Sequence, residues 1–190
     1  MKEKMMNEEK NPWILLDKKT VYESPWISVS HHDVLNPAGN PGTYSIVHFK
    51  NFAIGVLPLD KDYNTWIVGQ FRYPFNMYTW EIPEGGGPLK IDPLESAKRE
   101  LQEECGIVAN TFTFIQHMQL SNSATDEVAY LFIAQDLSFT KSSPDENEEL
   151  HVKKIHFDEL YKMVEEGKIT DSLTVTAVLK AKLLMLEGKL

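Results

Sequence analysis

The stretch EIPEGGGPLKIDPLESAKRELQEECGI, residues 81–107, places three consecutive glycines before a run of glutamates. If that run is helical, Glu100 and Glu104 lie one turn apart on the same face, and Glu103 lies on the neighbouring row. Hard divalent cations such as Mg²⁺ prefer carboxylate oxygens and keep coordination positions open for substrate phosphates. The spacing therefore indicates a candidate metal site that acts on a phosphate-containing substrate.

A solvated acidic helix face is the competing interpretation of the same residues. Glu95, Arg99 and Glu103 are spaced to form ion pairs four residues apart on such a face. Like charges at that spacing destabilise a helix by a few tenths of a kcal/mol per pair, however, and a bound cation offsets this repulsion. The glycine-rich segment, interpreted as a turn directly before the helix, favours the metal site.

Local signals place these acids on a helix that begins at about Pro93. Asp92 fits the N-cap, Pro93 the first helical position and Glu95 the third, which is the pattern of a capping box. Gly106 supplies a left-handed stop. An apolar stripe expected to face a sheet consists of Leu94, Ala97, Leu101 and Cys105.

The elements that must position this helix are mostly strands. Segments rich in β-branched and aromatic residues predict strands at 21–35, 43–49, 52–59, 65–73, 112–118, 128–134 and 150–157. Two closing helices are expected at about 158–165 and 172–186. The segments 52–59 and 65–73 are apolar enough to be buried on both faces and are expected to form the central sheet. The first two segments form a hairpin with little helix to cover it, so it is expected to pack on a partner.

Composition limits the class of protein. A chain of 190 residues suits one domain with an appendage or two small domains. A single cysteine, Cys105, excludes an internal disulfide framework, and we expect a cytoplasmic protein with no membrane segment. The net charge of −9 argues against nucleic acid as a partner. Residues 1–12 are charged and lack periodicity, so we expect them to be disordered or frayed.

The acidic stretch resembles the Nudix box, whose pattern is Gly, five residues, Glu, seven residues, then Arg-Glu-aliphatic-any-Glu-Glu-any-Gly-aliphatic. Gly85 matches the opening glycine, and the second half is matched without a gap by Arg99, Glu100, Leu101, Glu103, Glu104, Gly106 and Ile107. One position departs from the pattern, because Ile91 stands where the box has its first Glu. In the family that Glu is a supporting acid rather than the main metal ligand.

The similarity extends to the ADP-ribose pyrophosphatase branch of the family. It rests on WEIPEGG before the box, QFRY at 70–73, SATDEVAYLF at 123–132, DENEEL at 145–150 and YKMVEEGKITDSLTVTAV near the end. The resemblance implies an α/β protein, with a Nudix α/β/α sandwich and mixed β-sheet at 51–190. It also implies a small N-terminal antiparallel β subdomain at 13–50, which forms a homodimer by exchanging strands between subunits.

The resemblance further implies which residues bind metal. Glu100 and Glu104 would be ligands, Glu103 would share or bridge ions, and the main-chain carbonyl of Glu84 would complete the set. The cofactor implied is Mg²⁺, or alternatively Mn²⁺. Arg99 would orient the glutamates by ion pairing, and the alternative for Arg99 is a surface salt bridge.

A general base must also take a proton from the attacking water. In the resembling branch the base is a Glu on a late acidic loop, which places it at Glu146, with Glu148 as the second choice. The alternative is that these are solvated loop acids.

Substrate contacts are expected from several positions. Arg72 could pair with a phosphate, Glu81 and Glu127 could accept hydrogen bonds from sugar hydroxyls, and the backbone at Gly85 could approach the pyrophosphate. Each side chain could equally be structural. Trp26 could stack on a nucleobase or pack in a dimer interface.

These features predict metal-dependent hydrolysis of the pyrophosphate bond of a nucleoside diphosphate sugar. ADP-ribose, an ADP-sugar and a GDP-sugar are the candidate substrates. The branch's ADP-ribose enzymes can use an arginine on the second N-terminal strand to clamp adenine, and TYSIVHF at 43–49 has none. The alternative function is a catalytically weak, nucleotide-binding or sensing module with the Nudix fold.

Overall fold

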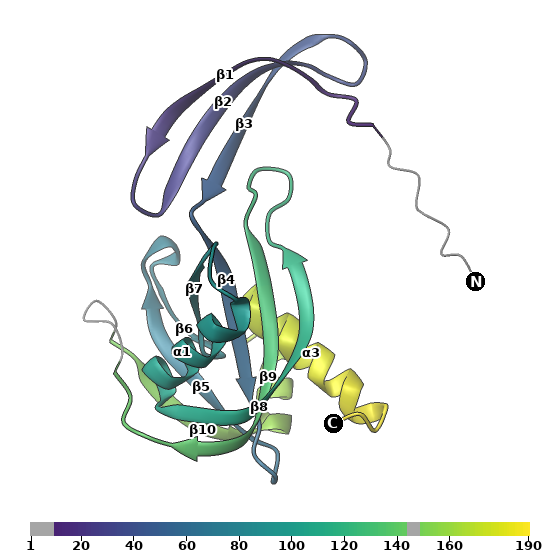
Figure 1. Cartoon of the computed structure of the whole chain (residues 1–190). Coiled ribbons are helices and arrows are strands. Elements are labelled where there is room, and N and C mark those ends of the chain that lie inside the picture. The colour runs from purple at the N-terminus through teal and green to yellow at the C-terminus, as the bar shows by residue number, and fades with distance from the viewer. Residues whose placement is uncertain (1–9, 144–148) are drawn as a thin grey trace. The chain divides into compact units, whose positions relative to one another are not determined.

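The computed structural model describes residues 10–143 and 149–190 (Figure 1). The chain divides into two compact units. One runs up to Lys50 and also includes Ser121–Asp126, and the other comprises Asn51–Leu120 and Glu127–Leu190. Each unit is described by itself below.

The first unit is built on one antiparallel sheet in the order β1-β2-β3 (Figure 1). Its strands are β1 (Ile14–Glu23), β2 (Ile27–Leu35) and β3 (Pro41–Phe49). The expected hairpin is confirmed as β2 and β3, which pair antiparallel. The single strand expected at 21–35 was wrong, because a turn at Ser24 separates β1 from β2; the Ser24 N–H donates to the carbonyl of Ile27 at 2.9 Å. Every residue of β1 is exposed, so β1 has no buried face. The sequence analysis placed the start of this strand at residue 21 and therefore missed its first half.

The second unit contains two further sheets (Figure 1). Their orders are β10-β5-β6 and β7-β4-β9-β8, and β4 pairs with β9 in parallel while its pairing with β7 is antiparallel. The strands are β4 (Asn51–Pro58), β5 (Asn64–Arg72), β6 (Met77–Glu81), β7 (Glu84–Pro88), β8 (Ile107–Gln119), β9 (Val128–Phe139) and β10 (His151–His156). A 3₁₀ turn, η1 (Tyr73–Phe75), joins β5 to β6.

Helices cover both faces of the four-stranded sheet. They are α1 (Pro93–Cys105), α2 (Phe157–Glu165) and α3 (Ser172–Leu186). Side chains of a strand alternate between its faces. On β9, Phe132 therefore belongs to the core that includes Leu101 of α1, whereas Leu131 belongs to the core that includes Leu160 of α2 and Ala177 of α3. This arrangement confirms the predicted α/β/α fold with a mixed sheet.

The strongly apolar strands were predicted best. The expected segments 52–59, 65–73 and 128–134 correspond to β4, β5 and β9. By contrast β6 was not predicted, and β8 begins at Ile107 rather than at 112. The expectation that 52–59 and 65–73 form one central sheet was wrong, because β4 and β5 lie in different sheets. Within the described part of the chain, no helix has the length and apolar character needed to cross a membrane.

Candidate active site

The three glycines lie in strand β7, so their interpretation as a turn was wrong. Gly85, Gly86 and Gly87 pair with residues of β4, and Gly85 stands opposite Ile54. A Cβ atom at Gly85 would collide with the carboxyl group of Glu100, and a Cβ atom at Gly87 would collide with the ring of Phe52. The glycines therefore allow close packing on this strand.

Helix α1 begins and ends at the residues that the sequence predicts. The Asp92 carboxylate caps the helix by accepting a hydrogen bond from the Leu94 N–H at 2.9 Å, and Gly106 ends it in the left-handed region at φ 62°. Glu95 pairs instead with Lys98, at 2.7 Å.

The glutamates predicted to bind metal differ sharply in exposure. Glu100 and Glu104 are buried, at 8% and 3% exposure, whereas Glu103 is partly exposed. Carboxylates of ordinary surface helices are rarely buried unless they are paired. This burial contradicts a purely solvated acidic face for Glu100 and Glu104.

Arg99 contacts two of these acids. Its guanidinium donates to Glu103 and to Glu100, each at 2.6 Å, and to the main-chain carbonyl of Gly86 at 2.8 Å. One side chain thus ties two acids of α1 to strand β7. The neighbouring carboxylates also raise the pKa of Arg99 by stabilising its charge, which outweighs the opposing effect of burial.

Glu84, at the start of β7, contacts the acidic helix through its backbone. Its N–H donates to the Glu104 carboxylate at 3.0 Å. Its own carboxyl group is bonded to Arg72 at 2.6 Å, and its other oxygen is buried with no hydrogen bond to any described residue. Burial, and then the charges of Asp171 and Glu81, raise the pKa of Glu84 well above its ordinary value, against the effect of Arg72.

Arg72, the last residue of β5, is bound by two carboxyl groups. It donates to Glu81 at 2.5 and 3.2 Å and to Glu84 at 2.6 Å. Glu81 is only 2% exposed and also accepts a hydrogen bond from Gln70 at 2.6 Å. A substrate phosphate at Arg72, or a sugar hydroxyl at Glu81, would therefore compete with existing bonds, and both contacts stay predictions.

The remaining predicted site residues are Trp26, Glu127 and the two candidate bases. Trp26 is 70% exposed at the turn between β1 and β2, in the first unit, and Glu127 directly precedes β9. The two candidate bases, Glu146 and Glu148, lie outside the described residues.

Gln70 and Asp171 interact with the acids around Arg72 and had no role in the sequence analysis. Gln70 bonds to Glu81, and Asp171 caps α3 by accepting from the Thr174 N–H at 2.7 Å while its charge acts on Glu84. An Asp before a helix is a recognisable capping signal. Its proximity to Glu84 depends on how α3 packs, which no local pattern reveals.

The side chains offer the donors that a hard cation prefers. Among residues 10–143 and 149–190, no three His, Cys, Asp or Glu side chains converge as ligands in this conformation. The buried carboxyl groups of Glu100 and Glu104 on α1 nevertheless supply carboxylate oxygens, the preferred ligands of Mg²⁺. Cation binding by Glu100 and Glu104 would compete with Arg99 and with the Glu84 N–H.

An α/β/α sandwich whose glycine-bearing strand packs against a helix with the Arg99–Glu104 pattern defines a Nudix hydrolase. Residues 50–173 match the NUDIX domain, and residues 13–47 match the nucleoside diphosphate sugar hydrolase N-terminal domain. The chain belongs to the Nudix family, whose hydrolases generally use divalent metal ions. The resemblance found in the sequence is thereby confirmed.

The chain is also similar to individual proteins. The ADP-ribose pyrophosphatase of Bacillus subtilis (strain 168) is 30% identical over 163 residues, covering 85% of this chain and 88% of that protein. The methanol dehydrogenase activator of Bacillus methanolicus is 28% identical over 171 residues, covering 86% and 92%. A crystal structure of an ADP compounds hydrolase has a TM-score of 0.84 at 21% identity, covering 96% of this chain and all of that one, which shows the shared fold.

Proposed function

We propose that this Nudix hydrolase cleaves the pyrophosphate bond of a nucleoside diphosphate sugar, releasing a nucleoside monophosphate and a sugar phosphate. The observation that carries the proposal is the burial of Glu100 and Glu104 against strand β7, at Gly85 and the Glu84 N–H. The match at 13–47 and the relative named ADP-ribose pyrophosphatase support this substrate class. ADP-ribose, an ADP-sugar and a GDP-sugar are the candidates.

Glu100, Glu104 and Glu103, with the main-chain carbonyl of Glu84, would hold Mg²⁺ or Mn²⁺. Bound at these oxygens, a divalent cation neutralises diphosphate charge and lowers the pKa of a coordinated water. The protein carries a net charge of −9, so an anionic substrate gains little from long-range attraction. Local neutralisation at the glutamates therefore matters for binding as well as for chemistry.

Arg99 acts as a positioning residue in this proposal. Its bonds to Glu100, Glu103 and the Gly86 carbonyl restrict the carboxylates to one side of α1. Arg72 has the same role for Glu84, whose carboxyl group it holds at 2.6 Å.

A glutamate of the acidic loop serves as general base, Glu146 first and Glu148 second. The water oxygen bonds to one phosphorus as the bond from that phosphorus to the bridging oxygen breaks, and the water proton passes to the glutamate. The described chain supports this choice, because the Ser143 N–H donates to the Glu103 carbonyl at 2.9 Å.

Assays of nucleoside diphosphate sugars with Mg²⁺ or Mn²⁺, scored by released mononucleotide, test the proposal. We expect turnover of at least one compound, and we expect Glu100→Gln and Glu104→Gln to lower kcat by about 10²-fold or more, because each removes a carboxylate that would hold the cation. Glu95→Gln is the matched control, since Glu95 is an exposed acid of the same helix.

Two outcomes of these assays would contradict the proposal. Turnover that is unaffected by both substitutions excludes the assigned site. No turnover of any compound, together with binding of nucleotide, favours the sensing module. Comparison of Glu146→Gln with Glu148→Gln then identifies the base, which should lower turnover and leave cation binding intact.

We further propose a homodimer in which the N-terminal strands at 13–50 are exchanged between subunits. The exposed apolar residues of β1 support it, and they are Ile14, Leu15, Leu16, Val21 and Tyr22. Large apolar side chains exposed on a strand are typical of surfaces that pack on a partner. Light scattering of the purified protein should give twice the 21.8 kDa of one chain, and a monomer at assay concentrations would contradict this part.

A further inference from the structure

The first unit contains a hydrogen-bonded chain of side chains that the Nudix reaction does not use. The Asp126 carboxylate lies 2.6 Å from Nδ1 of His48, and Nε2 of His48 lies 2.7 Å from Oγ of Ser30. The same Oγ lies 2.8 Å from Nε2 of His32. We call these four residues the Ser30 network.

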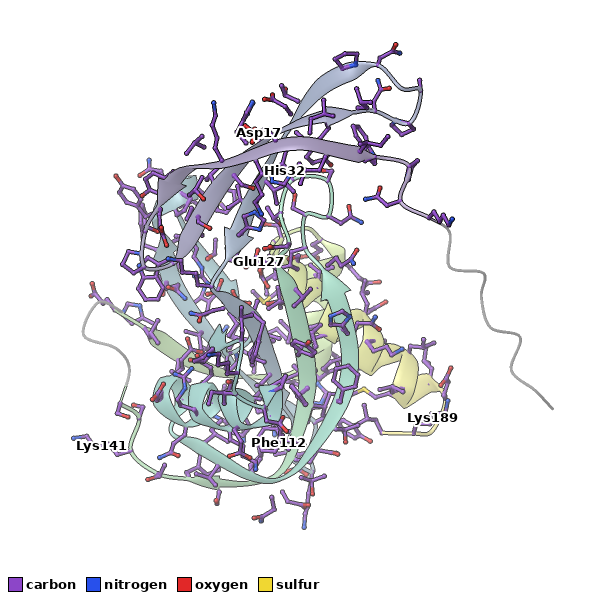
Figure 2. The ribbon with its side chains drawn as sticks, turned by 45° about the horizontal axis from the view of Figure 1, so that its top comes forward. Asp17, His32, Phe112, Glu127, Lys141 and Lys189 are labelled. Carbon is purple, nitrogen blue, oxygen red and sulfur yellow. The ribbon has the colours of Figure 1, made fainter. Side chains whose placement is uncertain are left out.

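Strand geometry brings the network together. Ser30 and His32 are two residues apart on β2, so they share a face of the sheet. His48 lies on β3 opposite Ser28, one diagonal step from Ser30. Asp126 comes from the segment Ser121–Asp126, and its second oxygen accepts from the Phe49 N–H at 3.0 Å. Figure 2 labels His32 on this sheet.

The roles of donor and acceptor follow from the chemistry of imidazole. A neutral ring has one N–H, so when His48 donates from Nδ1 to Asp126, its Nε2 accepts from the Ser30 hydroxyl. Ser30 can then accept the Nε2–H of His32. With both rings neutral, each of the three hydrogen bonds has one donor and one acceptor.

One added proton can be accommodated. If His48 becomes charged, its Nε2 donates to Ser30, whose hydroxyl turns to donate to Nε2 of His32, and His32 changes to the tautomer with its proton on Nδ1. If both rings become charged, both donate to Ser30, whose own buried hydroxyl proton has no acceptor left in the network. Ser30 is 1% exposed, so water does not replace that acceptor.

We propose that Ser30 limits this network to a single proton, which His48 holds beside Asp126, and that uptake of this proton tightens the attachment of residues 121–126 to β3. The attachment already includes backbone bonds, from the Val47 N–H to the Ala124 carbonyl at 2.9 Å and from the Asp126 N–H to the Val47 carbonyl at 3.3 Å. A charged His48 strengthens its bond to Asp126, because hydrogen bonds between ionised groups are the stronger ones.

The charges around the network favour this order of protonation. Burial, then Lys18 of β1 and the neighbouring rings of His48 and His31, lower the pKa of His32. The pKa of Asp126 is lowered as well, since the hydrogen bonds from His48 and from the Phe49 N–H outweigh its desolvation.

The remaining ionisable groups that pack around the network do not reverse this order. Asp33 of β2 lies 3.7 Å from His31, and Tyr44 of β3 donates to the Ser123 carbonyl at 2.6 Å. Both are engaged with groups outside the network.

Burial also distinguishes the network from a serine nucleophile. An Asp-His-Ser arrangement activates a hydroxyl only where a substrate can reach it. Ser30 does not line the adjacent cavity of ≈490 Å³, whereas His32, His48 and Asp126 do. The cavity therefore gives water and protons access to the rings but gives no substrate access to the hydroxyl.

Histidine ring NMR signals of the full-length protein, followed from about pH 8 to pH 5, test the proposal. We expect the two rings to take up their protons in separate steps, as for strongly coupled sites, with His32 protonated in the later step because its pKa is lowered. In Ser30→Ala the separation between these steps should shrink, because the shared hydroxyl is gone. Ser45→Ala is the matched control, since Ser45 contacts only the outward ring of His31, at 3.3 Å.

A second variant keeps the proposal testable if Ser30→Ala does not fold. In Asp126→Asn, His48 should take up its proton at lower pH, and the backbone amides at positions 47 and 126 should exchange several-fold faster near pH 6. Simultaneous protonation of His32 and His48 in the wild type would overturn the proposal. So would an unchanged separation in folded Ser30→Ala, or unchanged exchange in Asp126→Asn.

Discussion

The carboxyl group of Glu100 lies against the backbone of Gly85, in the space that a Cβ atom at position 85 would occupy. The contact joins the opening glycine of the Nudix box to the glutamate of its Arg-Glu pair. It also lets Glu100 remain buried, at 8% exposure, while Arg99 bonds to it. The glycine therefore determines how closely the acidic helix approaches β7.

Gly85→Ala should displace Glu100 and lower activity strongly. Overpacking of this kind costs about 1–3 kcal/mol, so we expect folded protein with reduced stability in urea and a larger loss in kcat. Gly86→Ala is the control, because its Cβ would meet only the flexible Asn51 side chain, at 3.3 Å. Equal activity of the two variants would show that the contact at Gly85 is unimportant.

Arg72→Met should destabilise the fold, because Glu81 and Glu84 would lose their shared cation. We expect a loss of about 1–3 kcal/mol in the free energy of unfolding, since Arg72 is itself partly solvated. Burial is the largest cause of the raised pKa of both acids. A raised folded pKa means that the folded state binds more protons than the unfolded state, so stability falls as pH rises above the ordinary glutamate pKa of about 4.3.

The pH dependence of Arg72→Met makes the prediction specific. Urea unfolding should show a larger penalty at pH 7 than at pH 5, where the carboxyl groups can be neutral. A penalty independent of pH would indicate lost packing instead. Lys98→Met, which removes an exposed cation from α1, should change stability little at either pH.

Asp60→Asn should remove a pH-dependent part of the stability. Desolvation alone would raise the pKa of Asp60, but hydrogen bonds from Asn64, Lys154 and the Asp62 N–H lower it to about 2. A lowered pKa contributes stability above the unfolded value of about 3.9, and this is lost as pH falls toward 2. Wild type should therefore exceed Asp60→Asn by about 1–2 kcal/mol at pH 7, and the two should converge in acid.

Urea unfolding between pH 7 and pH 2.5 measures this difference. Asp62→Asn is the matched control within the same turn, because Asp62 contributes only its backbone N–H to Asp60. A constant gap between wild type and Asp60→Asn across this range would contradict the assignment.

Cys105 should be unreactive in the folded protein. Burial, and then the charge of Glu104, raise the pKa of its thiol well above the usual range, and the thiolate is the reactive form. We expect a disulfide reagent such as DTNB to label the native protein at least ~tenfold more slowly than the protein in urea. Rapid labelling of native protein would show that the thiol is accessible and ionised.

The part of the site that could be predicted consists of residues whose positions depend on spacing between neighbours in the sequence. Glu100 and Glu104 could be placed on one face of α1 because helical spacing alone brings them together. Asp92 and Gly106 marked the ends of that helix for the same reason. Strand β7 was missed because glycine has no side chain to reveal a periodicity, and its extended form comes from pairing with β4.

The amino-acid sequence by itself determined the family, the acidic helix, its caps and the apolar strands, because each depends on spacing within a few neighbouring residues. Only the tertiary structure decided that Glu100 packs on Gly85, that Arg72 binds Glu81 and Glu84, and that the Ser30 network forms. These contacts join positions brought together by strand pairing and helix packing, and a contact between distant positions leaves no periodic trace in the chain.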